Sequence, residues 1–436
     1  MQTIDAVLNA GNLTNACYEV IRNKGAAGVD KMSVKELKDH LDKNRQELTG
    51  QIRNGNYIPQ PIRGKEIPKG NGKIRLLGIP TVIDRMLQQA VSRIIMPQFE
   101  YTFSKYSFGF RPERNTLQAV VKSLDYINSG YQYIVDIDLK GFFDEVDHCL
   151  LMNLLYQKVK CPTTLQLIRH WLRAPIWQDG ILSKRRKGVP QGSPISPLLS
   201  NIMLHELDME MEKRQLRFVR YADDFSIYCK TSQEARTIGN TIYVFLRDKL
   251  KLPINREKSG IRRPLDFKIL GYGFVPTYRK GENGKYQLVV QEKRWESLKA
   301  KLKEITRKTT PMSFDERIQK LKEVHRGWIN NFRLASMQEK LKELDGWLRN
   351  RLRYCIWHHW KKSECKRKNL IRLGVDPDDA YAWSRTRMGG WAVAQSPILG
   401  TTITIERLMK RGYEALTNWY IKVAPRYKSY PLFPIV

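Results

Sequence analysis

The chain has 436 residues, and its content of 42% hydrophobic and 10% aromatic residues is typical of a globular protein and excludes a disordered one. Its 76 lysines and arginines outnumber 44 aspartates and glutamates, and the net charge of +32 favours a nucleic-acid partner over an acidic membrane surface or a basic surface that is only solvated. No apolar run is long enough to cross a bilayer, and the first residues lack the basic and apolar regions of a secretory signal.

The first hundred or so residues are predicted to combine helices with one strand pair. Apolar residues recur at helical spacing over residues 15–23, 34–55 and 82–99. The stretch EIPKGNGKIRLLGIP (66–80) is typical of two strands joined by a turn at its central glycines. We therefore expect a small antiparallel pair between the second and third of these helices.

Two later strands carry aspartates near one end. YQYIVDIDL alternates apolar and polar residues and puts Asp136 and Asp138 on one face of a strand. FVRYADDFSI is typical of a tight hairpin whose tip holds Asp223 and Asp224. Neighbouring carboxylates repel each other, so such a pair is either a solvated turn or a set of ligands for metal ions.

Two turn segments accompany these strands. In KGVPQGSPISPLLSNIML (187–204), Ser196 and Pro197 are predicted to take the N-cap and first positions of a helix. The free N–H groups of such a helix start can face phosphate. After the hairpin, INREKSG places Lys258 beside a turn, and KILGYGF (268–274) is typical of another short strand pair.

Beyond residue 285 the sequence is typical of long, basic, amphipathic helices, over residues 293–305, 313–332 and 337–360. The second of these begins with a serine and a glutamate in capping-box spacing. Residues 279–372 contain 26 basic and 11 acidic residues, a surplus of 15. Such a surplus predicts a helical face that binds a nucleic acid duplex.

The six cysteines form no C-x-x-C pair, which argues against a zinc site and a disulfide framework and favours a reducing cytoplasm. We expect them to fill apolar spaces. The seven histidines form no metal-binding motif, and His358 and His359 are expected to pack or stack in their helix.

In order, these segments resemble the palm of reverse transcriptases: an aspartate strand, a Q-G-S-P turn, a Y-A-D-D hairpin, an N-x-x-K turn and a G-Y strand pair. More narrowly, the chain is similar to the reverse transcriptase and maturase encoded by group II introns. The segments that carry this likeness are NKGAAGVD, EIPKGNGKIRLLGIPTVIDRMLQQA, FSKYSFGFRPERNTLQAV and RGWINNF. The resemblance covers nearly the whole chain.

The resemblance implies an α+β right-hand polymerase whose palm contains a ferredoxin-like antiparallel sheet. We expect an N-terminal extension over residues 1–65, fingers and palm over 66–278, a helical thumb and maturase domain over 285–372 and a basic DNA-binding region over 373–436. The implied function is RNA-directed DNA synthesis on intron RNA, with assistance to splicing. The implied partners are intron RNA, a template RNA and primer DNA duplex, target DNA and deoxynucleoside triphosphates, without a membrane.

The resemblance also implies two Mg²⁺ ions, which can activate a primer 3′-hydroxyl and stabilise the leaving pyrophosphate. We expect Asp138 and Asp223 to be shared ligands and Asp224 to be the third catalytic carboxylate. Asp136 is an alternative because strand parity does not separate it from Asp138, whereas the spacing D-x-K-x-F-F-D favours Asp138. Asp144 is expected to cap the following helix.

Other residues are expected around the incoming nucleotide. Phe143 would lie under the sugar and exclude a 2′-hydroxyl, with a core aromatic residue as the alternative. Lys69 and Arg75 would clamp the triphosphate, with Lys73 as an alternative. Gln191 and Gly192 would contact the incoming nucleotide and the template, with a plain turn as the alternative. Lys258 would neutralise or protonate the pyrophosphate, with a structural ion pair as the alternative.

Nucleic-acid contacts are expected from a basic loop and from the basic helices. The candidate residues are Lys184, Arg185, Arg186, Lys187, Arg349, Arg353, Lys361 and Lys362. After Cys365 the chain has neither cysteine nor histidine, so we expect no H-N-H nuclease and priming from a nascent strand or another available 3′ end. The basic and aromatic stretch 383–433 resembles the short DNA-binding tail of the family.

Three other functions are weighed against this one. A splicing cofactor with a vestigial polymerase would not need the complete set of three carboxylates. A retron-type reverse transcriptase would lack the RGWINNF helices and the tail. An RNA-templated RNA polymerase would not be expected to carry a ring at Phe143.

Overall fold

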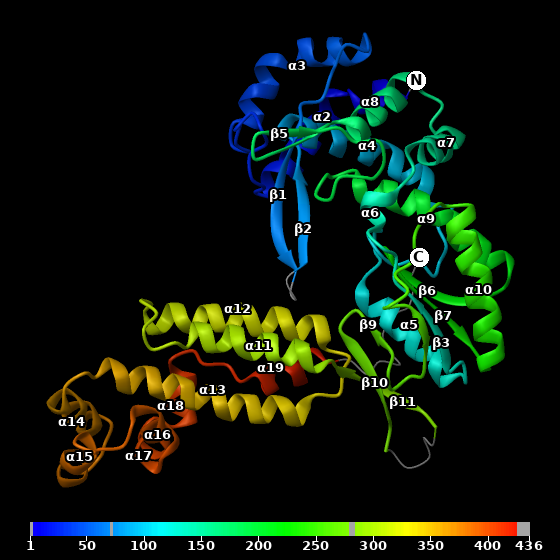
Figure 1. Ribbon diagram of the computed structural model, residues 1–436. Helices are drawn as coiled ribbons and strands as arrows, with labels where there is room; N and C mark the ends of the chain where they lie inside the picture. The colour runs from blue at the N-terminus through cyan, green and yellow to red at the C-terminus, as the bar shows by residue number, and fades with distance from the viewer. Residues whose placement is uncertain (1–2, 70–72, 279–283, 425–436) are drawn as a thin grey trace. The chain divides into compact units, whose positions relative to one another are not determined.

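The computed structural model describes residues 3–69, 73–278 and 284–424, which form two compact units (Figure 1). The first unit extends to Arg263 and the second begins at Pro264. This division comes earlier than the expected palm boundary at 278, and the finer domain limits stay a prediction. No helix in the described part of the chain combines the length and the apolar character that a membrane span requires.

The N-terminal part of the first unit is a helical layer beside a small sheet. Strands β1 and β2 pair antiparallel, as predicted, and β4 and β5 extend the sheet in the order β2-β1-β4-β5. The turn between β1 and β2 lies outside the described residues. The elements are α1 (Thr3–Val7), α2 (Ala10–Arg22), α3 (Leu37–Arg53), β1 (Ile62–Lys69), β2 (Lys73–Ile79), α4 (Val82–Glu100), β4 (Ile176–Gln178) and β5 (Ile181–Ser183).

The rest of the first unit is built on an antiparallel sheet in the order β6-β7-β3-β8, which confirms the α+β class. Helices α5 and α10 pack against it, and α9 carries buried residues on all sides because it runs through the core. The elements are α5 (Thr116–Asn128), β3 (Tyr133–Ile137), α6 (Phe142–Glu145), α7 (His148–Lys158), α8 (Pro162–Arg173), α9 (Ser196–Lys213), β6 (Arg217–Tyr221), β7 (Asp224–Cys229), α10 (Ser232–Asp248) and β8 (Gly260–Arg262).

The second unit contains a three-stranded antiparallel sheet and helices. Helices α11, α12, α13 and α19 pack together, and the predicted capping box of Ser313 and Glu316 starts α12. The elements are β9 (Lys268–Ile269), β10 (Tyr272–Pro276), β11 (Tyr286–Val290), α11 (Glu292–Ile305), α12 (Phe314–Phe332), α13 (Gln338–His359), α14 (Ser363–Arg372), α15 (Pro377–Ser384), α16 (Gly390–Gln395), α17 (Pro397–Thr402), α18 (Ile405–Lys410) and α19 (Leu416–Val423).

Candidate active site

The hairpin of β6 and β7 carries the predicted aspartate pair at its tip. Tyr221 pairs with Asp224, so Ala222 and Asp223 are the two turn residues. Ala222 has a φ of 57°, a left-handed conformation that alanine rarely adopts. Gly109 packs directly against it, because a Cβ atom on Gly109 would lie 2.3 Å from the Ala222 nitrogen. The surrounding chain therefore fixes the strained turn.

The register of β3 against β7 brings the first aspartate strand to this tip. Asp136 pairs with Ser226 and Ile137 with Phe225. Continuing the same register by one residue leads from Ile137 to Asp138 and from Phe225 to Asp224. Opposed residues in an antiparallel ladder have Cα atoms roughly 4.5–5.5 Å apart. Asp138 and Asp224 are thus adjacent although they are distant in the sequence.

Residues of the N-x-x-K turn hold Asp138 in place. The Asp138 N–H donates to the Ser259 hydroxyl at 3.0 Å, and the Asn255 side-chain amide donates to Asp138 Oδ2 at 3.0 Å. Lys258 Nζ lies 3.5 Å from the same carboxylate oxygen. Lys258 therefore faces Asp138. This contact is the structural ion pair that the sequence left open as the alternative role of Lys258.

Repulsion among carboxylates is concentrated on Asp224. Asp224 is exposed, yet its pKa is raised to about 6. The first cause is loss of water to neighbouring protein atoms, and the second is repulsion from Asp223, followed by Asp138 and Asp136. Since Asp224 is exposed, the part of this shift that bears on the site is the repulsion from the other three carboxylates.

Asp136, the alternative ligand, has a different environment. Its carboxylate accepts a hydrogen bond of 2.8 Å from Arg262 Nε on β8. Burial raises the pKa of Asp136, and the Arg262 guanidinium opposes that rise. A carboxylate hydrogen-bonded to arginine at 2.8 Å is a poorer metal ligand than one held by an amide with a lysine at 3.5 Å, which favours Asp138 over Asp136.

We tested whether these residues fit Mg²⁺. Among the described residues, no group of three or more His, Cys, Asp or Glu side chains forms a ready-made metal cage. Mg²⁺ rarely uses such a cage, because it usually takes one or two carboxylates together with water and substrate phosphate. Asp138, Asp223 and Asp224 supply hard oxygen donors, and a cation would relieve the repulsion that raises the Asp224 pKa. The donor set therefore fits.

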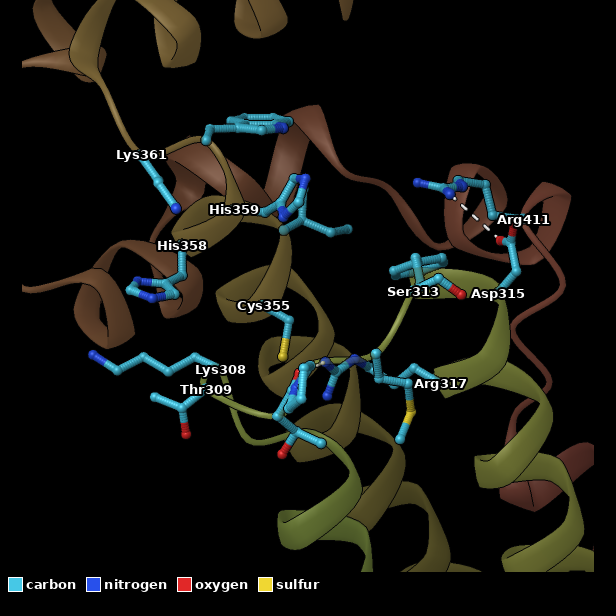
Figure 2. A pocket seen from close by; sticks show the side chains of 16 residues that line it. Lys308, Thr309, Ser313, Asp315, Arg317, Cys355, His358, His359, Lys361 and Arg411 are labelled. Carbon is cyan, nitrogen blue, oxygen red and sulfur yellow. Dashed lines mark hydrogen bonds and ion pairs between the residues drawn. The ribbon is translucent and has the colours of Figure 1, made fainter.

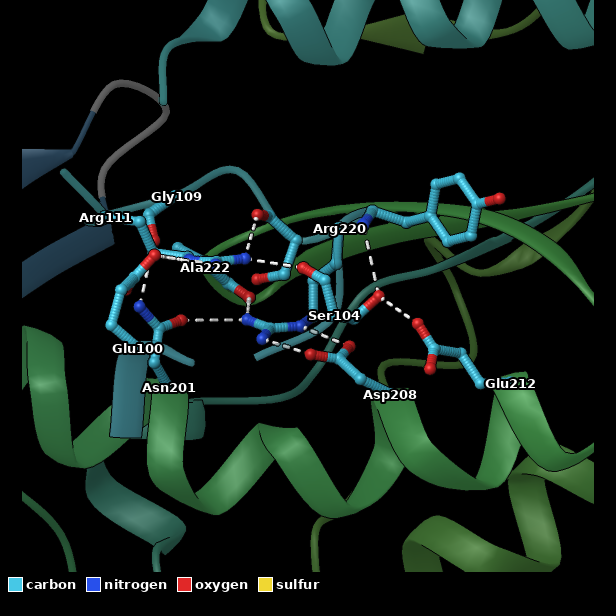
Figure 3. Close-up of polar contacts among 11 residues, drawn as sticks. Glu100, Ser104, Gly109, Arg111, Asn201, Asp208, Glu212, Arg220 and Ala222 are labelled. Atoms are coloured by element: carbon cyan, nitrogen blue, oxygen red, sulfur yellow. Dashed lines mark hydrogen bonds and ion pairs between the residues drawn. The ribbon is translucent and has the colours of Figure 1, made fainter. Parts of the chain in front are cut away.

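A buried ion pair beneath the hairpin was missed by the sequence reasoning (Figure 3). Arg220 and Asp208 are both fully buried and are joined by two hydrogen bonds of 2.7 and 2.6 Å. Arg220 Nη1 also donates to Asn201 Oδ1 and to the Ala222 carbonyl, each at 3.0 Å. Asn201 in turn donates to the Gly109 carbonyl at 2.9 Å. The strained turn is thus supported from α9.

The loop that carries Gly109 is fastened to the same strand. Phe108 N–H donates to the Arg220 carbonyl at 2.8 Å, and Arg220 N–H donates to the Tyr106 carbonyl at 2.9 Å. Arg111, which pairs with Glu100, donates to carbonyls inside the loop. The available signal was Arg220 between Val219 and Tyr221 in a predicted strand, together with Asp208 between Leu207 and Met209 on a helix.

Phe143 lies on the short helix α6, half-buried, with its ring 5.3 Å from the Phe142 ring in an edge contact. Its place under a nucleotide sugar stays a prediction. Asp144 does not cap the next helix, contrary to expectation. Residues 142–145 form α6 themselves, and α7 begins only after Asp147, whose side chain accepts from Leu150 N–H at 2.9 Å.

The basic loop after β5 divides into two kinds of side chain. Lys184 and Arg186 are exposed, as a phosphate contact requires. Lys187 is exposed as well, but it pairs with Glu145 at 2.6 Å. Burial lowers the pKa of Arg185 to about 10, and its Nη1 is buried without a hydrogen-bond partner among the described residues. Lys187 and Arg185 therefore lie near the acidic residues of α6.

The Q-G-S-P turn packs against the end of β2, where Gly78 N–H donates to the Gln191 carbonyl at 2.8 Å. Gly192 has a φ of 112°, and a Cβ atom there would lie 2.7 Å from the Gly78 oxygen. The predicted N-cap role of Ser196 is wrong: α9 begins at Ser196, after Ile195. The Ser196 hydroxyl donates to the Pro190 carbonyl at 2.7 Å, so it closes the turn instead of capping the helix.

The candidate triphosphate clamp lies at the free end of the β1–β2 pair. Lys69 pairs with Lys73, and Ile67 pairs with Arg75. The side chains of both lysines lie outside the described part of the structure, whereas Arg75 is exposed. The clamp stays a prediction.

The candidate nucleic-acid residues of the second unit also differ from one another. Arg353 donates to the Ile403 carbonyl at 3.0 Å, and burial lowers its pKa, so this guanidinium holds the C-terminal helices. Arg349 is half-buried, whereas Lys361 and Lys362 are exposed. Exposure leaves the two lysines available to a polyanion.

All six cysteines are free thiols. The expectation that they fill apolar spaces is right for Cys17, Cys161 and Cys229, which are buried. It is wrong for Cys149 and Cys365, which are exposed because their helix positions face solvent.

Comparison with known proteins finds two family models in the chain. Reverse transcriptase (RNA-dependent DNA polymerase) matches residues 67–274, and the group II intron maturase-specific domain matches residues 295–374. The chain is 31% identical over 323 residues to Protein YkfC of Escherichia coli (strain K12), a match that covers 64% of the chain and 85% of that protein.

Two intron-encoded proteins are also similar. The group II intron-encoded protein LtrA of Lactococcus lactis subsp. cremoris is 31% identical over 324 residues, which covers 59% of the chain and 54% of LtrA. The putative COX1/OXI3 intron 2 protein of Saccharomyces cerevisiae is 27% identical over 285 residues, covering 52% of the chain and 33% of that protein. The chain thus spans about half the length of LtrA.

Proposed function

Since the chain belongs to the family of group II intron reverse transcriptases with a maturase domain, we propose that Asp138, Asp223 and Asp224 are the catalytic carboxylates of its RNA-directed DNA polymerase. They would hold two Mg²⁺ ions. The main support is the register of β3 against β7, which makes Asp138 a neighbour of the hairpin tip. Bound Mg²⁺ supplies a lowered pKa for the primer 3′-hydroxyl and charge neutralisation for the leaving pyrophosphate.

The chain's own residues would position the reactants. Lys69 and Arg75 would bind the triphosphate, and Phe143 would exclude a 2′-hydroxyl beneath the sugar. Gln191 and Gly192 would contact the nucleotide and template. Lys258, which lies 3.5 Å from Asp138, would neutralise or protonate the pyrophosphate as that group departs.

The maturase domain would bind intron RNA and stabilise its folded form. Its proposed limits are 285–372, between a palm that ends at 278 and a DNA-binding region from 373. The proposed partners are intron RNA, a template RNA and primer DNA duplex, target DNA and deoxynucleoside triphosphates. Exposed Lys184, Arg186, Lys361 and Lys362 are the proposed phosphate contacts.

The test is primer extension on an RNA template by the wild type and Asp223→Asn, with RNA binding measured in parallel. Loss of one electrostatic stabiliser should slow extension by about a hundredfold or more and leave RNA affinity unchanged. Asp248→Asn, which removes the same charge from the exposed end of α10, is the matched control. Unimpaired extension by Asp223→Asn would overturn the assignment.

A further inference from the structure

The second unit contains a cavity of about 700 Å³ between the end of α13 and the connector of residues 306–313 that joins α11 to α12 (Figure 2). Its walls are fixed by buried polar contacts. Arg317, almost fully buried, donates to three carbonyl groups at residues 305, 307 and 310. Cys355 Sγ donates to the Thr306 carbonyl at 3.1 Å. A cavity with such walls is formed before any ligand arrives.

Positive charge gathers at one side of this cavity. Figure 2 shows the side-chain ends of Lys308 and Lys361 near His358. Burial, then Lys308 and Lys361, lowers the pKa of His358, with Lys366 and His359 adding to the effect. Two ammonium groups that both act on one imidazole create a positive potential there, which favours the binding of an anion.

Negative charge at the cavity is limited to one side chain among the described residues, and an arginine lies beside it. Asp315 is the one acidic side chain among the described residues that line it, and it accepts from Arg411 at 3.4 Å. Lys308 lies 5.6 Å from the centre of the Tyr354 ring, an arrangement that orients the ammonium group and keeps its full charge. The lysines therefore remain available to a ligand.

Aromatic side chains complete the lining. Phe314 and Trp360 line the cavity, and Arg411 lies 4.2 Å from the centre of the Phe314 ring. Cations bind phosphate oxygens, and aromatic rings stack on bases that are not paired. Both kinds of group occur here in a volume within the range of small-ligand sites.

We propose that this cavity binds one unpaired nucleotide of a nucleic-acid strand, with its phosphate between Lys308 and Lys361 and its base against Trp360. A nucleotide within a duplex could not enter, because its base is stacked and paired. The proposal rests on the proposed RNA-binding function of the maturase domain and names the element that this domain would hold.

The test compares the double variant Lys308→Gln/Lys361→Gln with Lys301→Gln/Lys320→Gln, a control that removes two exposed lysines elsewhere on the second unit. Fluorescence anisotropy at several salt concentrations measures binding to oligoadenylate RNA, oligodeoxyadenylate and an RNA duplex of equal length. Loss of the contacts to this one single-strand phosphate should reduce the slope of log K against log salt by about 0.7. The control should change that slope by less than the Lys308→Gln/Lys361→Gln variant does.

Trp360→Leu should weaken single-strand binding by roughly 5- to 150-fold, the range for loss of one stacked base, and leave duplex binding within about twofold. Trp360→Phe keeps a ring and should retain most of the affinity. A loss of affinity for the RNA strand alone means that the site binds RNA. An equal loss of affinity for the RNA and DNA single strands means that it binds both. Equal losses for duplex and single strand, or for the lysine pair and its control, would overturn the proposal.

Primer extension by the same variants separates this inference from the proposed function. Wild-type protein that neither extends a primer nor binds RNA would refute the proposed function. If the wild type binds RNA but the Lys308→Gln/Lys361→Gln variant binds single strands just as tightly, the nucleotide site alone is refuted.

Discussion

Arg220→Met is the most direct test of how the hairpin tip is positioned. Arg220 makes four hydrogen bonds of 2.6–3.0 Å, two to Asp208 and one each to Asn201 and the Ala222 carbonyl. Both charged partners have 0% exposure. The substitution removes all four bonds and leaves the Asp208 carboxylate buried without its counter-charge.

The expected magnitude follows from that burial. Removing one partner of a buried ion pair costs about 3–5 kcal/mol of unfolding free energy. In a unit of this size each kcal/mol lowers Tm by roughly 2–4 °C, so Arg220→Met should lose roughly 6–20 °C. The double variant Arg220→Met/Asp208→Leu also removes the stranded charge and should regain most of that stability.

Stability and activity should separate in the double variant. Its Ala222 carbonyl still lacks a donor, so the strained turn loses its support from α9. A misplacement of about 1 Å in a catalytic group can slow a reaction by about a hundredfold. We therefore expect near-normal melting with primer extension reduced by about that factor.

The assays are thermal unfolding followed by circular dichroism and single-nucleotide primer extension at saturating substrate. Arg214→Met is the control, because its pair with Glu210 is partly exposed and should be worth less than about 1 kcal/mol. Recovery of both stability and extension in the double variant would refute the positioning role. Failure to recover stability would refute the reasoning about the buried charge.

Three further measurements test the site and the helices. The pKa of Asp224 is raised from its ordinary value of 3.8 to about 6, so ionisation of this carboxyl destabilises the metal-free protein as the pH rises between those values. Asp224→Asn should therefore raise Tm at pH values above about 6. This gain in Tm should disappear as the pH falls towards 3.8. Phe143→Ala should admit ribonucleotides in primer extension, and unchanged sugar selection with intact folding would remove the assignment of that ring. Ser313→Ala should lower the stability of the second unit by about 1 kcal/mol in thermal melts through loss of the capping box, whereas Ser313→Asp should retain most of it.

Local patterns predicted much of the palm. The alternation in YQYIVDIDL and the two-residue turn in FVRYADDFSI both depend on interactions within or between adjacent strands, and both elements appear where they were predicted. The β1–β2 pair and the capping box at Ser313 are equally local. Such features follow from backbone geometry and need no knowledge of distant residues.

The sequence predictions fail where a residue distant in the sequence determines the local structure. Ser196 resembles an N-cap in sequence, but the Pro190 carbonyl takes its hydroxyl and shifts the helix boundary. Asp144 belongs to the short helix α6, so Asp147 and not Asp144 caps the start of α7. Arg220 and Asp208 meet only after α9 and β6 fold back on each other, so no periodicity reveals their pairing.

Two of the contacts that position the candidate carboxylates act on the backbone. The Ala222 carbonyl accepts from Arg220, and the Asp138 N–H donates to Ser259. Backbone contacts of this kind fix where a carboxylate lies without neutralising its charge. Loss of water and then repulsion from Asp223, Asp138 and Asp136 raise the pKa of Asp224, and the repulsion persists in the folded chain until a divalent cation binds and relieves it. Wild-type protein should consequently gain more Tm from added Mg²⁺ than Asp224→Asn does.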